Sequence, residues 1–195
     1  MYAFISGNIV ELEPTHVVLD NQGIGYELKI SLTTYTGIKG KENCRLWTHF
    51  YVKEDQQSLF GFEHKAEREL FQLLISISGV GPSTAVMVLS SLSPSEVVDA
   101  ILMEQVNVIQ GVKGIGAKTA QRLILELKDK VGKLGFTGVG EIPAINDNNV
   151  KEQSLLALQA LGINKAMAQK SVDKILKSNP DLSVEDVIKQ ALKQK

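Results

Sequence analysis

The sequence contains one short glycine motif twice, and this repeat holds the residues best suited to bind a ligand. Gly79-Val80-Gly81 and Gly114-Ile115-Gly116 lie 35 residues apart. Apolar residues at helical spacing follow each copy, so each copy predicts a tight turn that opens a helix. Such a turn presents unpaired main-chain N–H groups and the positive end of a helix dipole. This chemistry favours binding of an anion such as a phosphate.

The residue types within each copy support the predicted turn. Glycines permit the positive φ angles that a tight turn needs and leave no side chain between backbone and ligand. Val80 and Ile115 are apolar, and we expect them to fill the space between the two helices of each hairpin. Pro82 suits the first turn of a helix, where its missing N–H costs nothing. One copy alone is equally typical of an ordinary capped helix pair, whereas two copies in register favour a binding site.

Composition sets limits on the class of protein. The chain has 195 residues, 44% hydrophobic and 22% charged, with a net charge of −1. No third of the chain is strongly basic, so a nucleic-acid site would depend on a local basic face and main-chain N–H groups. The single Cys44 excludes an intrachain disulfide. Neither a signal peptide nor a membrane span is predicted, and we expect a cytoplasmic protein.

Four segments differ in their patterning. Residues 1–62 contain five or six short strands and predict a small barrel of the oligonucleotide-binding (OB) type, with an SH3-like barrel as the rival; Thr36–Gly40 is a predicted turn in this segment. Residues 63–135 are helical and contain both glycine motifs. Residues 136–149 have the composition of a flexible linker. Residues 150–195 predict a small helical module, which at this size is typical of an interaction domain.

Capping signals give the helix boundaries. Ser93-Pro94-Ser95-Glu96 is a capping box that opens one connecting helix, predicted to carry Val97, Ile101 and Val108. In the last segment, Gly162 predicts the end of a helix.

This order of parts resembles the RuvA family of Holliday-junction branch-migration subunits. The resemblance covers the whole chain. Besides the two hairpins, it includes Thr48–Asp55, which leads into Leu59-Phe60-Gly61-Phe62, and Gly23-Ile24-Gly25-Tyr26-Glu27. It implies a β-then-α multidomain fold: an N-terminal OB-fold barrel, a central domain with two helix-hairpin-helix motifs, and a small three-helix, UBA-like C-terminal domain.

The resemblance also implies a function in recombination, DNA repair and the SOS response. Members assemble as fourfold-symmetric tetramers, or as octamers in which two tetramers enclose the DNA, and they hold a four-way junction open. The implied partners are the junction, the hexameric RuvB ATPase and the RuvC resolvase. No catalytic residue, metal or cofactor is expected in this chain, because the motor partner uses the ATP and magnesium.

Family roles then fall on particular residues. Glu54 and Asp55 match the acidic pin, which would repel phosphates at the crossover. Ser83 and Ala117 occupy positions where relatives often carry Lys. The absence of these lysines predicts weaker phosphate binding at the same location. The residues that the resemblance places against DNA are Gly79, Val80, Gly81, Ser83, Gly114, Ile115, Gly116, Lys118, Thr119 and Arg122. The positions that match the RuvB-binding patch are Leu158, Leu161, Ile163 and Leu192.

Two other chemistries fit parts of the sequence less well. Lys118 matches the nucleophile of a helix-hairpin-helix DNA glycosylase or lyase, but the nearest downstream acid is Asp129, within the same helical run. Gly111–Thr119 is similar to a phosphate-binding P-loop, yet Ala117 stands where that loop needs a glycine before its lysine.

Metal chemistry has no clear signal in the sequence. His16, His49 and His64 show no metal-ligand spacing. Glu54 and Asp55 lack the further acidic residues that a two-metal nuclease would need.

Overall fold

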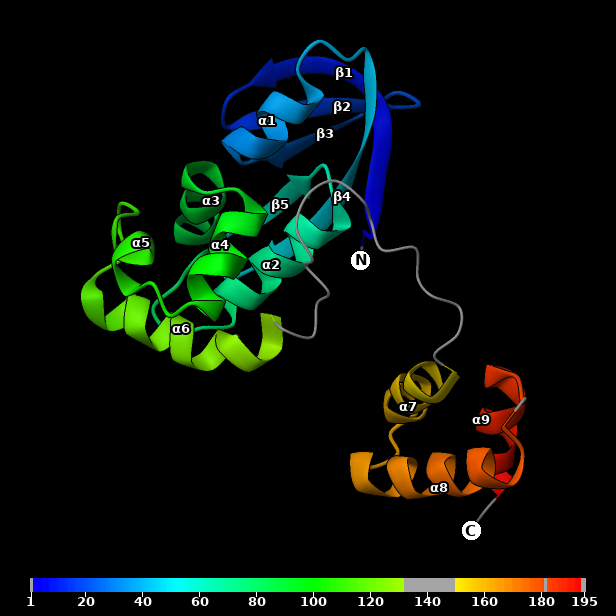
Figure 1. The fold of residues 1–195 in the computed structure, drawn as a ribbon. Helices are drawn as coiled ribbons and strands as arrows, with labels where there is room; N and C mark the ends of the chain where they lie inside the picture. Colours follow the sequence, from blue (N-terminus) through cyan, green and yellow to red (C-terminus); the bar gives the residue numbers. More distant parts are fainter. Residues whose placement is uncertain (1, 132–149, 181, 194–195) are drawn as a thin grey trace. The chain divides into compact units, whose positions relative to one another are not determined.

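The computed structural model describes residues 2–131, 150–180 and 182–193 (Figure 1). The chain forms two compact units, Met1–Val139 and Gly140–Lys195. The predicted linker, residues 136–149, lies outside the described residues. Among the described helices, no single one is long and apolar enough to cross a membrane. One pair, Pro82–Ser91 with Pro94–Leu102, has the length and composition of a membrane span when taken together, but it is bent by 98°.

The first unit begins with a closed five-stranded barrel in the order β1-β2-β3-β5-β4. All neighbouring strands are antiparallel except β3 and β5, which are parallel. A helix, α1, lies between the third and fourth strands in sequence, and this arrangement is the predicted OB fold. The elements are β1 (Phe4–Glu13), β2 (His16–Asn21), β3 (Ile24–Lys29), α1 (Leu32–Ile38), β4 (Asn43–Val52) and β5 (Gln57–Phe62).

Helix α1 was not expected, because the sequence predicted a turn at Thr36–Gly40. The segment is rich in threonine and has little intrinsic helix propensity. A local cap and tertiary burial overcome this: Ser31 caps the helix by accepting the N–H of Thr34 at 3.0 Å, and the barrel fully buries Thr34 and Ile38. The predicted turn is therefore wrong for residues 36–38, which are helical, and confirmed at Lys39 and Gly40, where Gly40 has a φ of +83°.

Up to residue 131, five helices follow the barrel: α2 (Lys65–Ile75), α3 (Pro82–Ser91), α4 (Pro94–Leu102), α5 (Val106–Gln110) and α6 (Ala117–Val131). The capping box at Ser93 is confirmed, with both of its reciprocal hydrogen bonds present. The predicted single connecting helix is wrong, because the chain breaks between α4 and α5 at Glu104, whose φ is +54°. There the N–H of Gln105 bonds the carbonyl of Ala100, a Schellman motif without the usual glycine. Val108 consequently lies in α5 and is exposed, not on the buried face that carries Val97 and Ile101.

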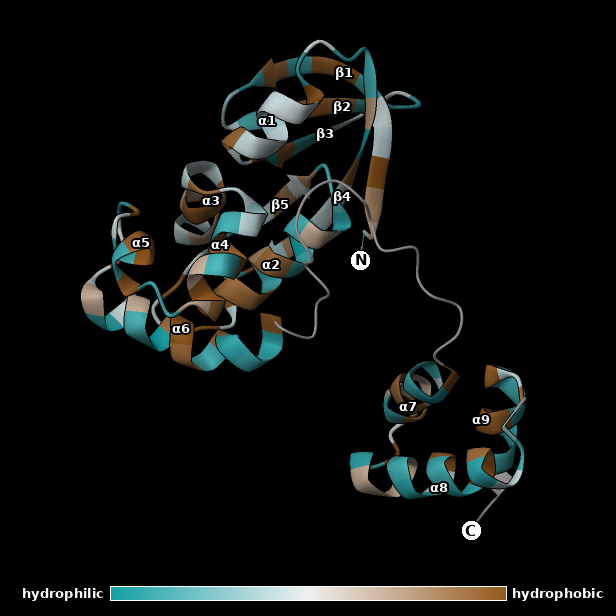
Figure 2. Ribbon diagram, viewed as in Figure 1, coloured by the Kyte–Doolittle hydropathy of each residue, from teal (hydrophilic) through white to brown (hydrophobic). Residues whose placement is uncertain are grey.

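One hydrophobic core joins the barrel to the helices. Phe71 of α2 packs against Phe60 and Phe62 of β5, with ring centres 5.0 and 4.9 Å apart. Figure 2 shows hydrophobic residues concentrated where α2, α4 and α6 face one another. The barrel and the hairpins therefore pack as one body.

The second unit is a three-helix module of α7 (Val150–Ala160), α8 (Lys165–Ser178) and α9 (Val184–Lys193). Gly162, with φ +86°, ends α7 as predicted, and the N–H of Ile163 bonds the carbonyl of Leu158. The core is small and consists of Leu158, Ala168, Val172, Ile175, Val187 and Ala191.

A buried carboxyl group links the barrel to α2. Glu67 is 1% exposed and accepts hydrogen bonds from the hydroxyls of Ser31, at 2.6 Å, and Thr34, at 2.9 Å. Burial raises the pKa of the Glu67 carboxyl above its ordinary value, although the two hydroxyl donors act in the opposite direction.

This raised pKa predicts that Glu67 contributes more stability to the first unit when it is protonated. Between the unfolded and the raised folded pKa of Glu67, the folded state holds more protons, so the unfolding free energy should fall as pH rises through that window. Glu67→Gln, which keeps a neutral hydrogen-bonding group, should remove this pH dependence. Urea unfolding followed by fluorescence of Trp47, the single tryptophan, measures it. An unchanged pH profile in the variant would contradict the assignment to Glu67.

Candidate nucleic-acid interface

The two glycine turns have the same backbone. Gly79 and Gly114 have φ of +94° and +92°. In the first turn the N–H of Val80 bonds the carbonyl of Ile77 at 3.0 Å, and in the second the N–H of Ile115 bonds Val112 at 3.1 Å. The repeat in the sequence is therefore a structural repeat.

The two glycines of each motif serve different purposes. The first needs its positive φ, which L-residues with side chains rarely adopt. The second does not: Gly81 has an ordinary φ of −86°, and Gly116 is also outside the positive region. A Cβ atom at Gly81 or Gly116 would meet no protein atom within 4 Å. Among the described residues, no packing or backbone constraint explains these two glycines. Their missing side chains leave room for a ligand to approach the backbone closely.

Unpaired main-chain donors surround these open positions. No acceptor among the described residues takes the N–H groups of Gly81, Ser83 and Thr84 in the first hairpin, or those of Gly116 and Lys118 in the second. The glycines are exposed. The side chains between them are 4% exposed at Val80 and 5% at Ile115, as predicted. Each hairpin thus offers a row of donors to solvent at the positive end of a helix.

The two turns are close neighbours. A Cβ atom placed on Gly79 would lie 3.9 Å from the hydroxyl oxygen of Thr119, in the first turn of α6. The donor rows of the two hairpins therefore lie close together, where both could contact phosphates of one nucleic-acid molecule.

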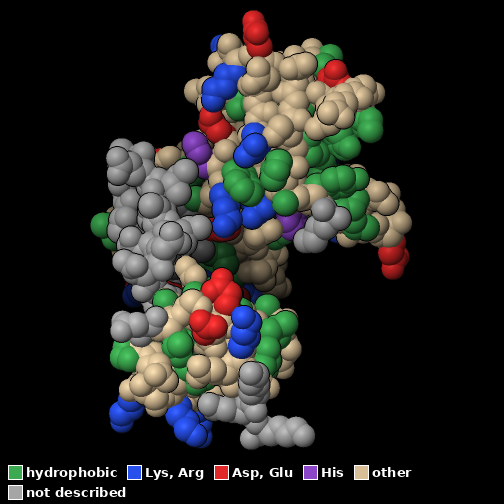
Figure 3. Space-filling model, turned by 90° about the vertical axis from the view of Figure 1, so that its right-hand side faces the viewer, with side chains coloured by type: hydrophobic (Ala, Val, Ile, Leu, Met, Phe, Trp, Pro, Cys, Tyr) green, Lys and Arg blue, Asp and Glu red, His purple; other side chains and the backbone are tan. Residues whose placement is uncertain are grey.

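The basic side chains near the turns belong to the second hairpin and not to the first. Lys118 is exposed in the first turn of α6, and Arg122 follows one turn later with its Nε 2.7 Å from Glu126 Oε1. The first hairpin has Ser83 at the position that corresponds to Lys118. At the first hairpin, main-chain donors must therefore contribute much of any attraction for phosphate. Figure 3 shows a different face, the right-hand side of the view in Figure 1, where basic and acidic side chains are interspersed.

The acidic pair lies at the tip of the β4–β5 hairpin. Glu54 and Asp55 are exposed, and the turn is closed by the N–H of Lys53 bonding the carbonyl of Gln56 at 2.8 Å. Within the described part of the chain, neither carboxylate has an ion-pair partner. The tip therefore presents two uncompensated negative charges to solvent.

One cluster has metal-ligating groups that the sequence did not reveal. Glu11, Glu13 and His16 place ligand atoms within 4.8 Å of one another, because the β1–β2 turn sets His16 opposite Glu13. His16 Nε2 lies 3.1 Å from Glu11 Oε1, so a hydrogen bond between exposed groups accounts for the arrangement. The signal that could have revealed this cluster is the two-residue turn at Pro14 and Thr15, which pairs Glu13 with His16 across two strands.

The predicted patch on the second unit is only partly on the surface. Leu158 is 0% exposed, so the prediction that its side chain faces a partner is wrong: it fills the core of the three-helix module. Leu161 is 61% exposed and Leu192 is 52% exposed, while Ile163 is half-buried. Two further exposed apolar side chains, which the sequence did not single out, are Leu156 and Met167.

Comparison with known proteins places each part of the chain. Residues 1–61 match the RuvA N-terminal domain, residues 71–129 the SAM-like helix-hairpin-helix tandem, and residues 149–194 the RuvA C-terminal domain.

Similarity to curated relatives extends over the full length. Proteins named Holliday junction branch migration complex subunit RuvA are 52% identical in Christiangramia forsetii and 49% identical in Bacteroides fragilis, with all of both chains covered. The one from Flavobacterium psychrophilum is 46% identical over 99% of each chain. With its barrel, paired hairpins and three-helix module all matched in order, the chain belongs to the RuvA family.

Proposed function

We propose that this chain binds four-way DNA junctions, holds them open for branch migration and recruits the RuvB ATPase. The observation that carries the proposal is the open space at Gly81 and Gly116, beside main-chain donors that have no partner among the described residues. Contacts of this kind attach to the sugar-phosphate backbone and carry no base information. The chain would therefore recognise the shape of a junction and not its sequence. The full-length relatives named as branch migration subunits support the same function.

Selectivity for a junction requires several copies around the crossover. A fourfold-symmetric tetramer would bring four β4–β5 tips together, where Glu54 and Asp55 repel phosphates and part the strands. A second tetramer could enclose the DNA. Leu125, 81% exposed on α6, offers an apolar surface for that contact.

The chain itself acts without catalysis in this proposal. ATP and magnesium belong to the motor, and RuvC is a further partner that resolves the junction. Such work takes place in the cytoplasm. The second unit would bind RuvB through Leu161 and Leu192, the exposed members of the predicted patch.

The lyase alternative is not favoured. Lys118 and Asp129 lie eleven residues apart on α6, about 16 Å along the helix axis, so the acid cannot act with the lysine. The P-loop alternative fails as well, because α5 and not a strand precedes the second glycine turn.

A gel-shift titration of the full chain tests the proposal directly. It compares a four-way junction with a linear duplex of equal length across salt concentrations. We expect tighter binding to the junction, with affinity falling as salt rises. Equal affinity for the two DNAs would overturn the proposed function.

Gly116→Ala should weaken junction binding about tenfold or more. A methyl group would hold the backbone away from phosphate, and a hydrogen bond to a charged group contributes about 1.5–3 kcal/mol. Its unfolding free energy should change by less than about 1 kcal/mol, since the position has room and needs no positive φ. Gly114→Ala is the contrasting variant: it should destabilise the fold by about 1–2 kcal/mol. If Gly116→Ala binds like the wild type, close backbone approach is not required.

Glu54→Lys combined with Asp55→Lys should raise affinity for plain duplex and reduce preference for the junction, because the repulsive charge at the tip is reversed. Glu42→Lys combined with Asp99→Lys adds the same charge at exposed positions elsewhere and serves as the control. Unchanged selectivity in the tip variant, measured by the same gel shift, would rule out the pin role.

Leu161→Asp combined with Leu192→Asp should abolish capture of RuvB while leaving junction affinity unchanged. Leu156→Asp, at an equally exposed leucine of the same unit that lies outside the predicted patch, is the control. Co-sedimentation with RuvB measures the first property, and gel shift measures the second. Retained capture by the double variant would show that the motor binds elsewhere.

A further inference from the structure

The first hairpin has no cation beside its turn. The second hairpin carries Lys118 in the first turn of its helix, whereas the first carries Ser83 at the corresponding position. No Lys or Arg occurs anywhere from residue 69 to residue 112. Because the two turns share one backbone geometry, a phosphate at the first turn would meet a similar row of main-chain donors. That row has one donor fewer, since Pro82 lacks the N–H that Ala117 offers, and no lysine corresponds to Lys118.

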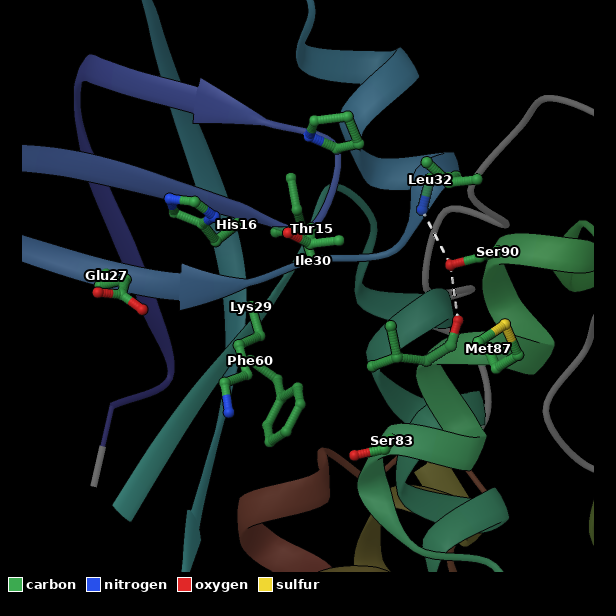
Figure 4. Close-up of a pocket in the computed structure, with 12 residues that line it drawn as sticks. Thr15, His16, Glu27, Lys29, Ile30, Leu32, Phe60, Ser83, Met87 and Ser90 are labelled. Carbon is green, nitrogen blue, oxygen red and sulfur yellow. Dashed lines mark hydrogen bonds between the residues drawn. The ribbon is translucent and has the colours of Figure 1, made fainter. Parts of the chain in front are cut away.

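The tertiary structure brings a barrel lysine to the same helix. A cavity of about 450 Å³ separates the barrel from α3, and both Lys29 and Ser83 line it. Figure 4 shows the Lys29 ammonium toward the end of the cavity where Ser83 lies. At the opposite end, the main-chain N–H of Leu32 bonds the Ser90 hydroxyl at 3.0 Å, which anchors α3 to the barrel.

Lys29 is held in place without losing its charge to an ion pair. It pairs with Phe60 across the parallel β3–β5 contact, and its Nζ lies 6.0 Å from the centre of that ring. Nζ also donates to the Ser58 hydroxyl at 3.3 Å. Among the described residues, no carboxylate lies within 4.0 Å of Nζ. Glu27 and His16 also line the cavity.

We propose that Lys29 binds the DNA phosphate that lies at the first hairpin turn. The barrel then supplies to the first hairpin what Lys118 supplies to the second. This inference rests on the proposed function, that the hairpins bind the backbone of junction arms. It makes the barrel a direct part of the DNA-binding surface.

Lys29→Gln tests the inference in the full chain by gel shift with a four-way junction from 50 to 200 mM salt. Removing one cation from a DNA phosphate should make the slope of log affinity against log salt shallower by about 0.9. Between 50 and 200 mM salt, the variant should therefore lose about 3.5-fold less affinity than the wild type. Lys39→Gln is the matched control, because it removes the same charge from a lysine that also lies over an aromatic ring. The Lys39 Nζ is 5.8 Å from the centre of the Tyr35 ring, and Lys39 does not line the cavity. Its slope should equal that of the wild type.

A second variant separates a DNA contact from an effect on folding. Adding Ser83→Lys to Lys29→Gln puts a cation on the first hairpin itself and should restore the wild-type slope. Equal slopes for Lys29→Gln and wild type would overturn the role of Lys29, as would equal losses in Lys29→Gln and Lys39→Gln. Either result leaves the proposed function intact, which fails only if the wild-type chain does not prefer the junction.

Discussion

The structure depends on one local constraint, a helix start whose main-chain N–H groups face solvent without a side chain in front of them. A positive φ at Gly79 and Gly114 turns the chain, and the absent Cβ at Gly81 and Gly116 leaves the donors open. Exposed N–H groups at a helix start bond to water. In the proposed function, a phosphate that approaches the backbone closely replaces that water. The core that barrel and hairpins share, centred on Phe71, holds these loops in place.

This constraint explains how a chain with net charge −1 can serve as a DNA-binding subunit. Oriented amides act as fixed partial charges and need few cations to attract phosphate. Low net charge also limits attraction to ordinary duplex, which is the competing ligand in every cell. In the proposed function, the exposed acids at the β4–β5 tip would act in the same direction. Selectivity for shape and weak general attraction would then follow from one distribution of charge.

Features that depend on local backbone chemistry could be predicted from the residues alone. The glycine repeat, the plugging of each turn by Val80 and Ile115, the capping box at Ser93 and the helix end at Gly162 all follow from the residues at those positions. The family and the OB-type barrel were also evident from the order of parts. Each of the local signals involves residues within a few positions of one another, where the physics is the same in any fold.

Features that depend on distant residues emerged only when the chain was packed. Helix α1 forms despite weak propensity because the barrel buries it. Helix α4 ends at Leu102, and the turn after it places Glu104 at a positive φ without the glycine that would have marked the break. Leucine spacing could not tell that Leu158 belongs to the core while Leu161 stays exposed. Lys29 is 54 residues from Ser83 in sequence, and packing of barrel against helix alone brings them to one cavity.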